Sequence, residues 1–405
     1  MTLIRPFAAL RPVSERSADV VAPPYDVLST AEARLRASGR PWSFLHISKP
    51  EIDLPEATDP HAPEVYARAA TNLQAMLEQG VLVRDETPCY YIYRMVMGEH
   101  TQTGLVVAAS VAAYDSNRIR KHEFTRPDKE DDRVRQIESL NAQTGPVLLA
   151  YESQQQVDAM LMSAAEAVAD VDLVADDGIR HLLWVVRDHA LIEQITVAFD
   201  AMDALYIADG HHRSAAASRV AASRDGAAGT NGFLAVVFPH RQMQIFDYNR
   251  VVRDLAGLTP ETLLSRVSEN FSISPADAAV HPQAPATFGM YLAGQWYSLA
   301  IKPKLVPEDP VGRLDVSLLA DNLLAPLLGI EDPRRDTRID FVGGIRGLGE
   351  LEKRVDSGEM AAAFSMFPTR MEDLMAVADA GEVMPPKSTW FEPKLVDGLV
   401  SLVFD

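Results

Sequence analysis

Residues 203–217 read Asp-Ala-Leu-Tyr-Ile-Ala-Asp-Gly-His-His-Arg-Ser-Ala-Ala-Ala, and this stretch decides the fold. Leu205–Ala208 is a short apolar run that suits a buried strand, and the alanine-rich segment 214–223 favours a helix because alanine has the highest helix propensity. Between them, Gly210 tolerates the backbone angles of a sharp turn after Asp209. The stretch therefore predicts a strand, a tight turn and a helix in direct succession.

The predicted turn has the chemistry of a phosphate site. Free N–H groups at the start of a helix attract anions, and an arginine beside them can hold a phosphate by two parallel hydrogen bonds. An aspartate at the same turn can bind a metal ion or accept a proton from a hydroxyl. The alternative is that Asp209 caps the helix and the two histidines only line the turn. The candidate ligand and catalytic residues are Asp209, Gly210, His211, His212, Arg213 and Ser214.

The segment 118–135 is rich in both basic and acidic side chains and is a second candidate stretch. Pro127 prevents one continuous helix, so we expect a loop here. Clustered cations neutralise phosphates, while a carboxylate binds a metal ion or takes a proton. A solvated helix face is the alternative interpretation of such a charge run. The candidate base and metal ligand is Glu123, and the candidate phosphate ligands are Lys121, Arg126, Lys129 and Arg133.

We expect the two stretches to meet in the folded protein. The turn at 210–213 has too few cations to balance a triphosphate, and the segment 121–133 has no clear run of free backbone donors. Together they would supply both, with Glu123 facing Asp209 across a metal ion or a substrate hydroxyl. Two carboxylates so close need a cation between them or a shared proton.

The composition excludes several classes of protein. The chain of 405 residues is 47% hydrophobic and 23% charged, which is typical of a globular protein of two or three domains. Its net charge of −19 argues against general nucleic-acid binding, because a phosphate backbone would be repelled. Cys89 is the only cysteine, residues 1–10 do not resemble a signal peptide, and no apolar run could span a bilayer. We therefore expect a cytoplasmic protein with no membrane or nucleic-acid partner.

The remaining periodicity predicts an α/β (α+β) fold with a mixed sheet at its core. A hairpin is expected over 89–113, a strand over 42–47 and a helix over 64–79. We predict two parts: a core domain with N-terminal strands over 1–250, and a C-terminal α+β domain over 251–405 packed on it.

The motif Asp209–Arg213, followed by Ala215 and Ala216, resembles the phosphate-binding motif of the ParB/sulfiredoxin superfamily, in which a Gly-x-x-Arg turn grips phosphates. That superfamily includes nucleotide-hydrolysing DNA-partition proteins, sulfiredoxins and free-serine kinases. The whole chain resembles the bacterial and archaeal domain-of-unknown-function family 1015, through three further stretches at 22–27, 121–133 and 384–391. The resemblance implies a ParB/sulfiredoxin-like nucleotide-binding core over 1–250.

The resemblance also extends the candidate site. It implies that Tyr25 and Asp26 contact the substrate. It further implies that 384–391 forms a wall of the active site, with Lys387 as a ligand of the nucleotide. Without the resemblance, both stretches are ordinary proline-rich turns.

Three functions follow as hypotheses. The first is a small-molecule kinase, similar to free-serine kinases, that uses ATP or ADP with Mg²⁺ held by Asp209 and Glu123. Such a kinase would not use the common phosphate-binding loop, because no Gly-x-x-x-x-Gly-Lys-Ser/Thr motif occurs in the sequence. The second is a nucleotide-binding switch that hydrolyses slowly and acts on a protein partner. The third is a metal-dependent hydrolase with His211, His212 and Asp209 as ligands. The expected partners are a nucleotide and a small-molecule substrate, and a homodimer is left open.

Overall fold

The computed structural model describes residues 2–225, 227 and 229–404. The chain forms two compact units, Met1–Met243 with Pro393–Asp405, and Gln244–Glu392. The C-terminal segment thus belongs to the first unit, whereas the sequence assigned all of 251–405 to the second part. The reason is burial, because Leu395, Val396, Leu399, Val400 and Leu402 all lie in the interior. The glycines and small residues over 226–232 predict a flexible loop, and Gly226 and Ala228 within it lie outside the described residues.

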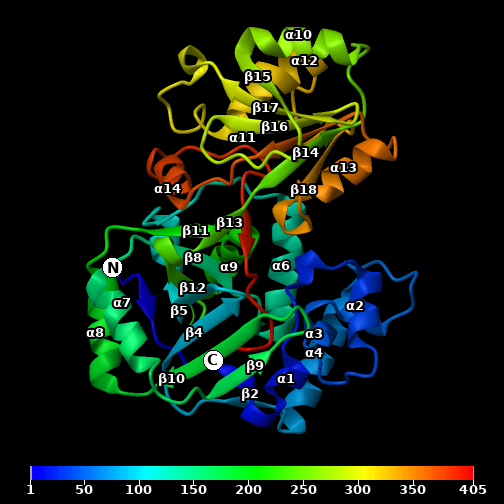
Figure 1. Ribbon diagram of the computed structural model, residues 1–405. Coiled ribbons are helices and arrows are strands. Elements are labelled where there is room, and N and C mark those ends of the chain that lie inside the picture. The colour runs from blue at the N-terminus through cyan, green and yellow to red at the C-terminus, as the bar shows by residue number, and fades with distance from the viewer. Residues whose placement is uncertain (1, 226, 228, 405) are drawn as a thin grey trace. The chain divides into compact units, whose positions relative to one another are not determined.

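The first unit is built on a nine-stranded mixed sheet (Figure 1). Along the sheet the order is β6-β11-β8-β12-β5-β4-β10-β9, and β1 pairs with β5. The pairs β6/β11 and β8/β12 are parallel and the others are antiparallel, so the predicted mixed sheet is confirmed. The strands are β1 (Ile4–Arg5), β4 (Tyr90–Met97), β5 (His100–Ser110), β6 (Ile119–Arg120), β8 (Val147–Tyr151), β9 (Val171–Val174), β10 (Arg180–Val186), β11 (Leu205–Asp209) and β12 (Gly232–Pro239).

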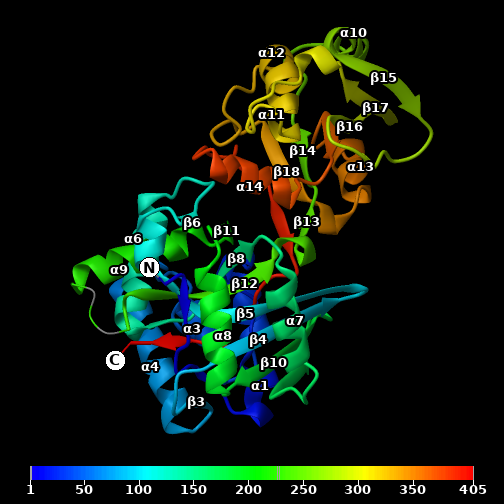
Figure 2. The same ribbon diagram turned by 90° about the vertical axis from the view of Figure 1, so that its left-hand side faces the viewer.

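Helices and two short strand pairs cover this sheet. Apolar residues of α7, α8 and α9 pack with the strands in one core, and residues of α2, α3 and α4 form a second. Figure 2 shows α7 and α8 side by side along the sheet. The strand pairs are β2 (Leu10–Pro12) with β3 (Leu82–Arg84), and β7 (Ala142–Gln143) with β21 (Leu402–Val403). The helices are α1 (Ser17–Val20), α2 (Thr30–Ala37), α3 (Leu45–Ser48), α4 (Pro63–Glu78), α5 (Val111–Asp115), α6 (Pro127–Leu140), α7 (Gln155–Ala164), α8 (His189–Asp200) and α9 (His211–Ser223), with short 3₁₀ turns at Ser14–Arg16, Tyr25–Val27, Pro50–Asp53 and His240–Gln242.

The second unit is a six-stranded antiparallel sheet with helices. Its order is β15-β17-β16-β19-β14-β18, and β13 pairs with β20 beside it. The strands are β13 (Gln244–Phe246), β14 (Tyr248–Val252), β15 (Phe271–Ala276), β16 (Thr287–Leu292), β17 (Gln295–Ile301), β18 (Ile339–Gly343), β19 (Ala362–Met366) and β20 (Trp390–Glu392). The helical segments are α10 (Pro260–Asn270), Pro303–Leu305, α11 (Asp315–Leu319), Ala320–Leu324, α12 (Ala325–Leu328), Gly344–Arg346, α13 (Gly349–Asp356) and α14 (Met371–Asp379).

Local predictions succeed where the signal is long and fail where it is short. The hairpin over 89–113 and the helix over 64–79 are confirmed as β4/β5 and α4. The strand expected over 42–47 is wrong, because this segment turns into helix α3. Phe44, Leu45 and Ile47 are buried against neighbouring helices, and a short apolar run cannot distinguish that environment from a strand.

The segment 121–133 is a loop only as far as Arg126. Helix α6 begins at Pro127, so the expectation of a loop over the whole segment is wrong. Proline is well suited to the first position of a helix, and Asp128 and Glu130 in the first turn complement the positive end of the helix dipole. Among the described helices, none is long and apolar enough to cross a membrane.

Candidate functional site

The centre of the site is the strand-turn-helix over 203–217. Strand β11 ends at Asp209, Gly210 has a φ of 99°, and α9 begins at His211. The helix starts earlier than the predicted Ser214, so His211 and His212 lie in its first turn, where backbone N–H groups have no acceptor within the helix. The left-handed φ explains the glycine, since other residues adopt it at a cost. The predicted strand, turn and helix are therefore present, and the binding of an anion at this turn stays a prediction.

Arg213 folds back over this turn. Its Nη2 lies 3.0 Å from Oδ2 of Asp209, and its Nη1 donates to the carbonyl oxygen of Pro146. A Cβ on Gly210 would lie 3.0 Å from Nε of Arg213, and one on Gly145 would lie 3.4 Å from its Cδ. Glycine at both positions therefore leaves room for the side chain. Arg213 thus stabilises the turn through its Nη1 and Nη2 contacts. Only the guanidinium N–H groups that these contacts do not use can bind a ligand.

The loop before α6 meets the first turn of α9, as the sequence predicted. The backbone N–H of His122 lies 3.4 Å from Nε2 of His211, and the backbone N–H of Arg126 donates to Nε2 of His212 over 3.1 Å. The neighbouring histidines thus face different parts of the loop. Each imidazole anchors one end of it, and the carboxylate of Glu123 lies between these two anchors in the chain.

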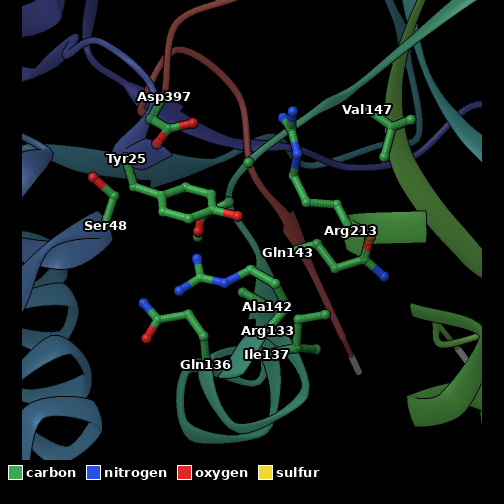
Figure 3. A pocket seen from close by; sticks show the side chains of 12 residues that line it. Tyr25, Ser48, Arg133, Gln136, Ile137, Ala142, Gln143, Val147, Arg213 and Asp397 are labelled. Atoms are coloured by element: carbon green, nitrogen blue, oxygen red, sulfur yellow. The ribbon is translucent and has the colours of Figure 1, made fainter. Parts of the chain in front are cut away.

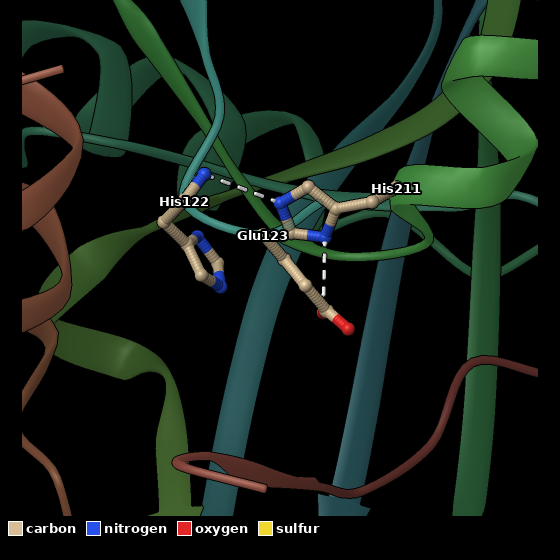
Figure 4. A group of neighbouring side chains, drawn as sticks. All are labelled: His122, Glu123 and His211. Carbon is tan, nitrogen blue, oxygen red and sulfur yellow. Dashed lines mark hydrogen bonds and ion pairs between the residues drawn. The ribbon is translucent and has the colours of Figure 1, made fainter. Parts of the chain in front are cut away.

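His122, Glu123 and His211 form a compact cluster (Figure 4). One potential ligand atom from each lies within 4.8 Å of the others, and Nδ1 of His211 is 3.6 Å from Oε2 of Glu123. Both histidines are buried, while the Glu123 side chain is 55% exposed. Burial lowers the pKa of His122 to about 4 and that of His211 well below its usual value. Both rings are therefore neutral at pH 7.

Beside Arg213 lies a cavity of about 30 Å³ (Figure 3). This volume suits ordered water and is far too small for a nucleotide. The guanidinium of Arg133 lies 3.9 Å from the centre of the Tyr25 ring, and Figure 3 shows these two side chains next to each other. The lining residues are Tyr25, Ser48, Arg133, Gln136, Ile137, Ala142, Gln143, Thr144, Gly145, Val147, Arg213 and Asp397.

Asp397 is the acidic residue in the lining of this cavity, and the sequence did not single it out. It is 1% exposed, its backbone pairs with Ala22, and its Oδ1 has no hydrogen-bond partner among the described residues. Burial raises the pKa of Asp397 to about 7, although the positive charges of Arg213 and Arg133 oppose the rise. The available signal was the Asp397-Gly398 pair between apolar residues, which repeats the Asp-Gly turn of the central motif.

Lys394 also lies in the C-terminal segment and acts on the central turn. Burial alone would raise the pKa of Asp209, but the guanidinium of Arg213 and the ammonium of Lys394 outweigh it and lower this pKa. Asp209 is therefore ionised at neutral pH. No sequence signal links Lys394 to Asp209, because the whole second unit separates them in the chain.

The predicted phosphate ligands of the segment 121–133 occupy different environments. Lys121 lies over the Tyr114 ring, with its Nζ 3.9 Å from the ring centre, and burial lowers its pKa. Arg133 is mostly buried and pairs with Asp132 over 2.6 Å. Both residues are partly buried.

The cations at the start of α6 are accessible. Arg126 pairs with Asp128 over 2.7 Å on the surface, and its side chain is 70% exposed. Lys129 is exposed in the first turn of α6. These two remain the better candidates for contacting a phosphate.

Three other predicted site residues, Ser214, Asp26 and Lys387, have different surroundings. Ser214 is fully buried, and its hydroxyl donates to the carbonyl oxygen of His211 over 3.0 Å, so it serves the helix rather than a ligand. Asp26 is exposed, next to the half-buried Tyr25. Lys387 belongs to the second unit, where its backbone carbonyl accepts a hydrogen bond from Arg250. Its predicted contact with a nucleotide stays a prediction.

The metal ligands predicted from the sequence differ from the cluster of His122, Glu123 and His211 that the structure contains. Glu123 lies with two imidazoles, while Asp209 is paired with Arg213. Mg²⁺ prefers oxygen ligands, so a mixed set of nitrogen and oxygen suits it poorly. Among the described residues, His211, His212 and Asp209 do not form a group with metal-binding spacing. The structure does not bring together the ligand set expected for a metal-dependent hydrolase, because Nε2 of His212 accepts a hydrogen bond from the backbone N–H of Arg126.

Residues 4–317 match the model of the family described as "Protein of unknown function (DUF1015)". The chain belongs to this family. Among curated proteins, none matches it.

Several solved structures are similar to this member of the DUF1015 family. A free serine kinase in complex with AMP is 14% identical with a TM-score of 0.36, over 71% of this chain and 86% of that one. SbnI with a C-terminal truncation, from Staphylococcus aureus, is 14% identical with a TM-score of 0.39, over 73% and 87%. A conserved hypothetical protein from Pyrococcus furiosus is 13% identical with a TM-score of 0.35, over 72% and 94%.

Proposed function

We propose that this protein is a nucleotide-dependent phosphotransferase that moves the terminal phosphate of ATP or ADP to a hydroxyl of a small metabolite. The observation that carries the proposal is the position of Glu123, 3.6 Å from the imidazole of the first residue of α9. An exposed carboxylate thus lies beside a helix N-terminus. Phosphoryl transfer needs both parts, an anion site and a group that takes the proton of the attacking hydroxyl.

Each part of the site would have one task. The N–H groups of His211 and His212 would receive the phosphates, with the remaining N–H groups of Arg213 beside them. Arg126 and Lys129 would add positive charge from the start of α6, and Mg²⁺ would be held mainly by the phosphate oxygens. Glu123 would accept the proton of the substrate hydroxyl.

Tyr25 and Asp26 are the proposed substrate contacts. The field of Asp26 acts on both Arg213 and Asp397, so its carboxylate lies within electrostatic reach of the central turn. An exposed carboxylate near an anion site can bind the ammonium group of an amino acid. Free serine, which carries both an ammonium and a hydroxyl, is therefore the first substrate to test.

The first experiment tests nucleotide binding. Thermal unfolding is measured with AMP, ADP and ATP in the presence of Mg²⁺, and binding is confirmed by calorimetry. Formation of a phosphate ester is then measured with serine and with other small hydroxyl compounds. Binding and slow hydrolysis without transfer to any acceptor would favour a nucleotide-binding switch over a kinase.

The second experiment tests the base. Glu123→Gln is expected to lower turnover by about 10²–10⁴-fold, the usual contribution of a general base, while nucleotide binding persists. The matched control is Glu138→Gln, the same chemical change at an exposed position on α6. Equal turnover of the two variants would remove Glu123 from the proposed mechanism.

A further inference from the structure

The cluster of His122, Glu123 and His211 has one feature that hydrogen bonding does not explain. His122 is 3% exposed, and its Nδ1 has no hydrogen-bond partner among the described residues. A buried polar atom without a partner costs about 1–3 kcal/mol, so such an atom calls for a ligand. Figure 4 shows the His122 ring next to Glu123 and His211, and the ring centres of the two histidines are 4.5 Å apart.

The other nitrogen of His122 is already occupied. The ring hydrogen-bonds with the backbone of Ile207, and because Nδ1 has no partner within the described part of the chain, Nε2 is the nitrogen that makes this bond. The neutral ring therefore carries its proton on Nε2 and leaves a lone pair on Nδ1. Histidines that bind metals have this arrangement, with the second nitrogen donating to a carbonyl or a carboxylate.

The spacing between His211 and Glu123 suits coordination better than a hydrogen bond. The 3.6 Å between Nδ1 and Oε2 exceeds the ordinary hydrogen-bond range of about 2.7–3.2 Å. Two ligands bound to one Zn²⁺ at about 2.0–2.1 Å and at a tetrahedral angle lie roughly 3.3 Å apart. The full set spans up to 4.8 Å, so modest side-chain movement would close it around an ion.

We propose that His122, Glu123 and His211 bind a divalent transition-metal ion of the series from Mn²⁺ to Zn²⁺. Two imidazoles and one carboxylate are a typical ligand set for Zn²⁺, Mn²⁺, Fe²⁺ or Co²⁺. The exposure of Glu123 leaves a coordination position open toward solvent, which is characteristic of catalytic rather than structural metal sites.

Metal binding changes one contact of His211. The backbone N–H of His122 approaches Nε2 of His211 at 3.4 Å, which is long for a hydrogen bond. With an ion on Nδ1, the proton of the neutral ring moves to Nε2 and this contact is lost. Because the contact is weak, its loss is small beside the gain of a metal–nitrogen bond.

The proposal does not rest on the phosphotransferase function. With the ion bound, Glu123 would be a metal ligand rather than the proton acceptor, and the ion itself would make a substrate hydroxyl on the open position lose its proton more readily. Without nucleotide, the site still binds the ion. Failure of phosphotransfer and failure of metal binding are therefore separate outcomes.

The test measures metal binding directly on the full chain, without nucleotide. The protein is treated with a chelator, dialysed and titrated with Zn²⁺, Mn²⁺ and Mg²⁺ in a calorimeter, and Co²⁺ is followed by its visible absorption. We expect one ion per chain, with Zn²⁺ bound more tightly than Mn²⁺ and Mg²⁺ weakest. A chain that binds no Zn²⁺ at this stoichiometry overturns the proposal.

Variants locate the site. Glu123→Gln and His122→Ala are expected to weaken Zn²⁺ binding by at least about 100-fold, because residues that only support a ligand already contribute 10–100-fold. Circular dichroism checks that His122→Ala folds, and the exposed Glu123→Gln keeps the test valid if it does not. His212→Ala is the matched control, since His212 adjoins His211 but faces Arg126. Wild-type affinity in Glu123→Gln, or equal loss in His212→Ala, refutes this ligand set.

Discussion

Replacing Asp397 by asparagine is expected to stabilise the protein at pH 8 and to change its stability little near pH 4. The carboxyl is buried in the cavity beside Arg213 and Arg133, and burial raises its pKa from 3.8 to about 7 despite these two positive charges. Ionised Asp397 is therefore a net cost to the folded state. Asparagine has nearly the same shape and cannot ionise.

The magnitude follows from the pKa difference between the two states. The folded protein keeps the Asp397 proton up to about pH 7, whereas an unfolded chain releases it near 3.8. Between these pH values the unfolded state binds fewer protons, so the free energy of unfolding falls as the pH rises. A difference of about three pKa units corresponds to an upper limit of about 4 kcal/mol, and relaxation of the site lessens it. We expect asparagine to add about 2–4 kcal/mol at pH 8.

The assay is urea unfolding of both proteins at pH 4.5, 6 and 8, followed by the fluorescence of Trp42 and Trp184 in the first unit. Urea keeps the ionic strength constant, which guanidinium would not. The stability difference should grow from pH 4.5 to pH 8. If Asp397→Asn is less stable than the wild type at pH 8, the two arginines outweigh burial, and the inferred direction of the pKa shift is wrong.

Two further substitutions probe the central turn. Arg213→Ala removes the partner of the half-buried Asp209 and of the Pro146 carbonyl, so it is expected to lower the free energy of unfolding by about 2–3 kcal/mol. The surface control Arg126→Ala should change this free energy by less than about 0.5 kcal/mol. Equal stability of the two variants in urea would contradict the structural role of Arg213. Gly210→Ala forces a left-handed φ on alanine and brings a Cβ to 3.0 Å from Nε of Arg213. The free energy of unfolding is therefore expected to fall by about 1–3 kcal/mol in the same assay. An unchanged free energy of unfolding would mean that the turn adopts other angles.

Comparison of sequence and structure shows which features are locally encoded. The apolar run before Asp209, the glycine after it and the alanines that follow specify a strand, a turn and a helix through interactions within a few residues. The exact start of α9 was missed, since His211 and His212 have no strong helix preference and the turn at Gly210 decides the boundary. Pro127 was read as a helix breaker, although at a first helical position it favours the start of α6.

The amino-acid sequence by itself determined the strand, turn and helix around Gly210, and it pointed to the segment with Glu123 as the neighbour of this turn. Only the tertiary structure decided which side chains surround this turn and Glu123. His122 could not be chosen from a run of charged residues, because its importance lies in burial and in an unpartnered nitrogen. Asp397 and Lys394 reach the site because the C-terminal segment packs back into the first unit. Such contacts depend on the burial of distant apolar residues such as Leu395 and Val400, and no local propensity encodes which parts of the chain that burial brings together.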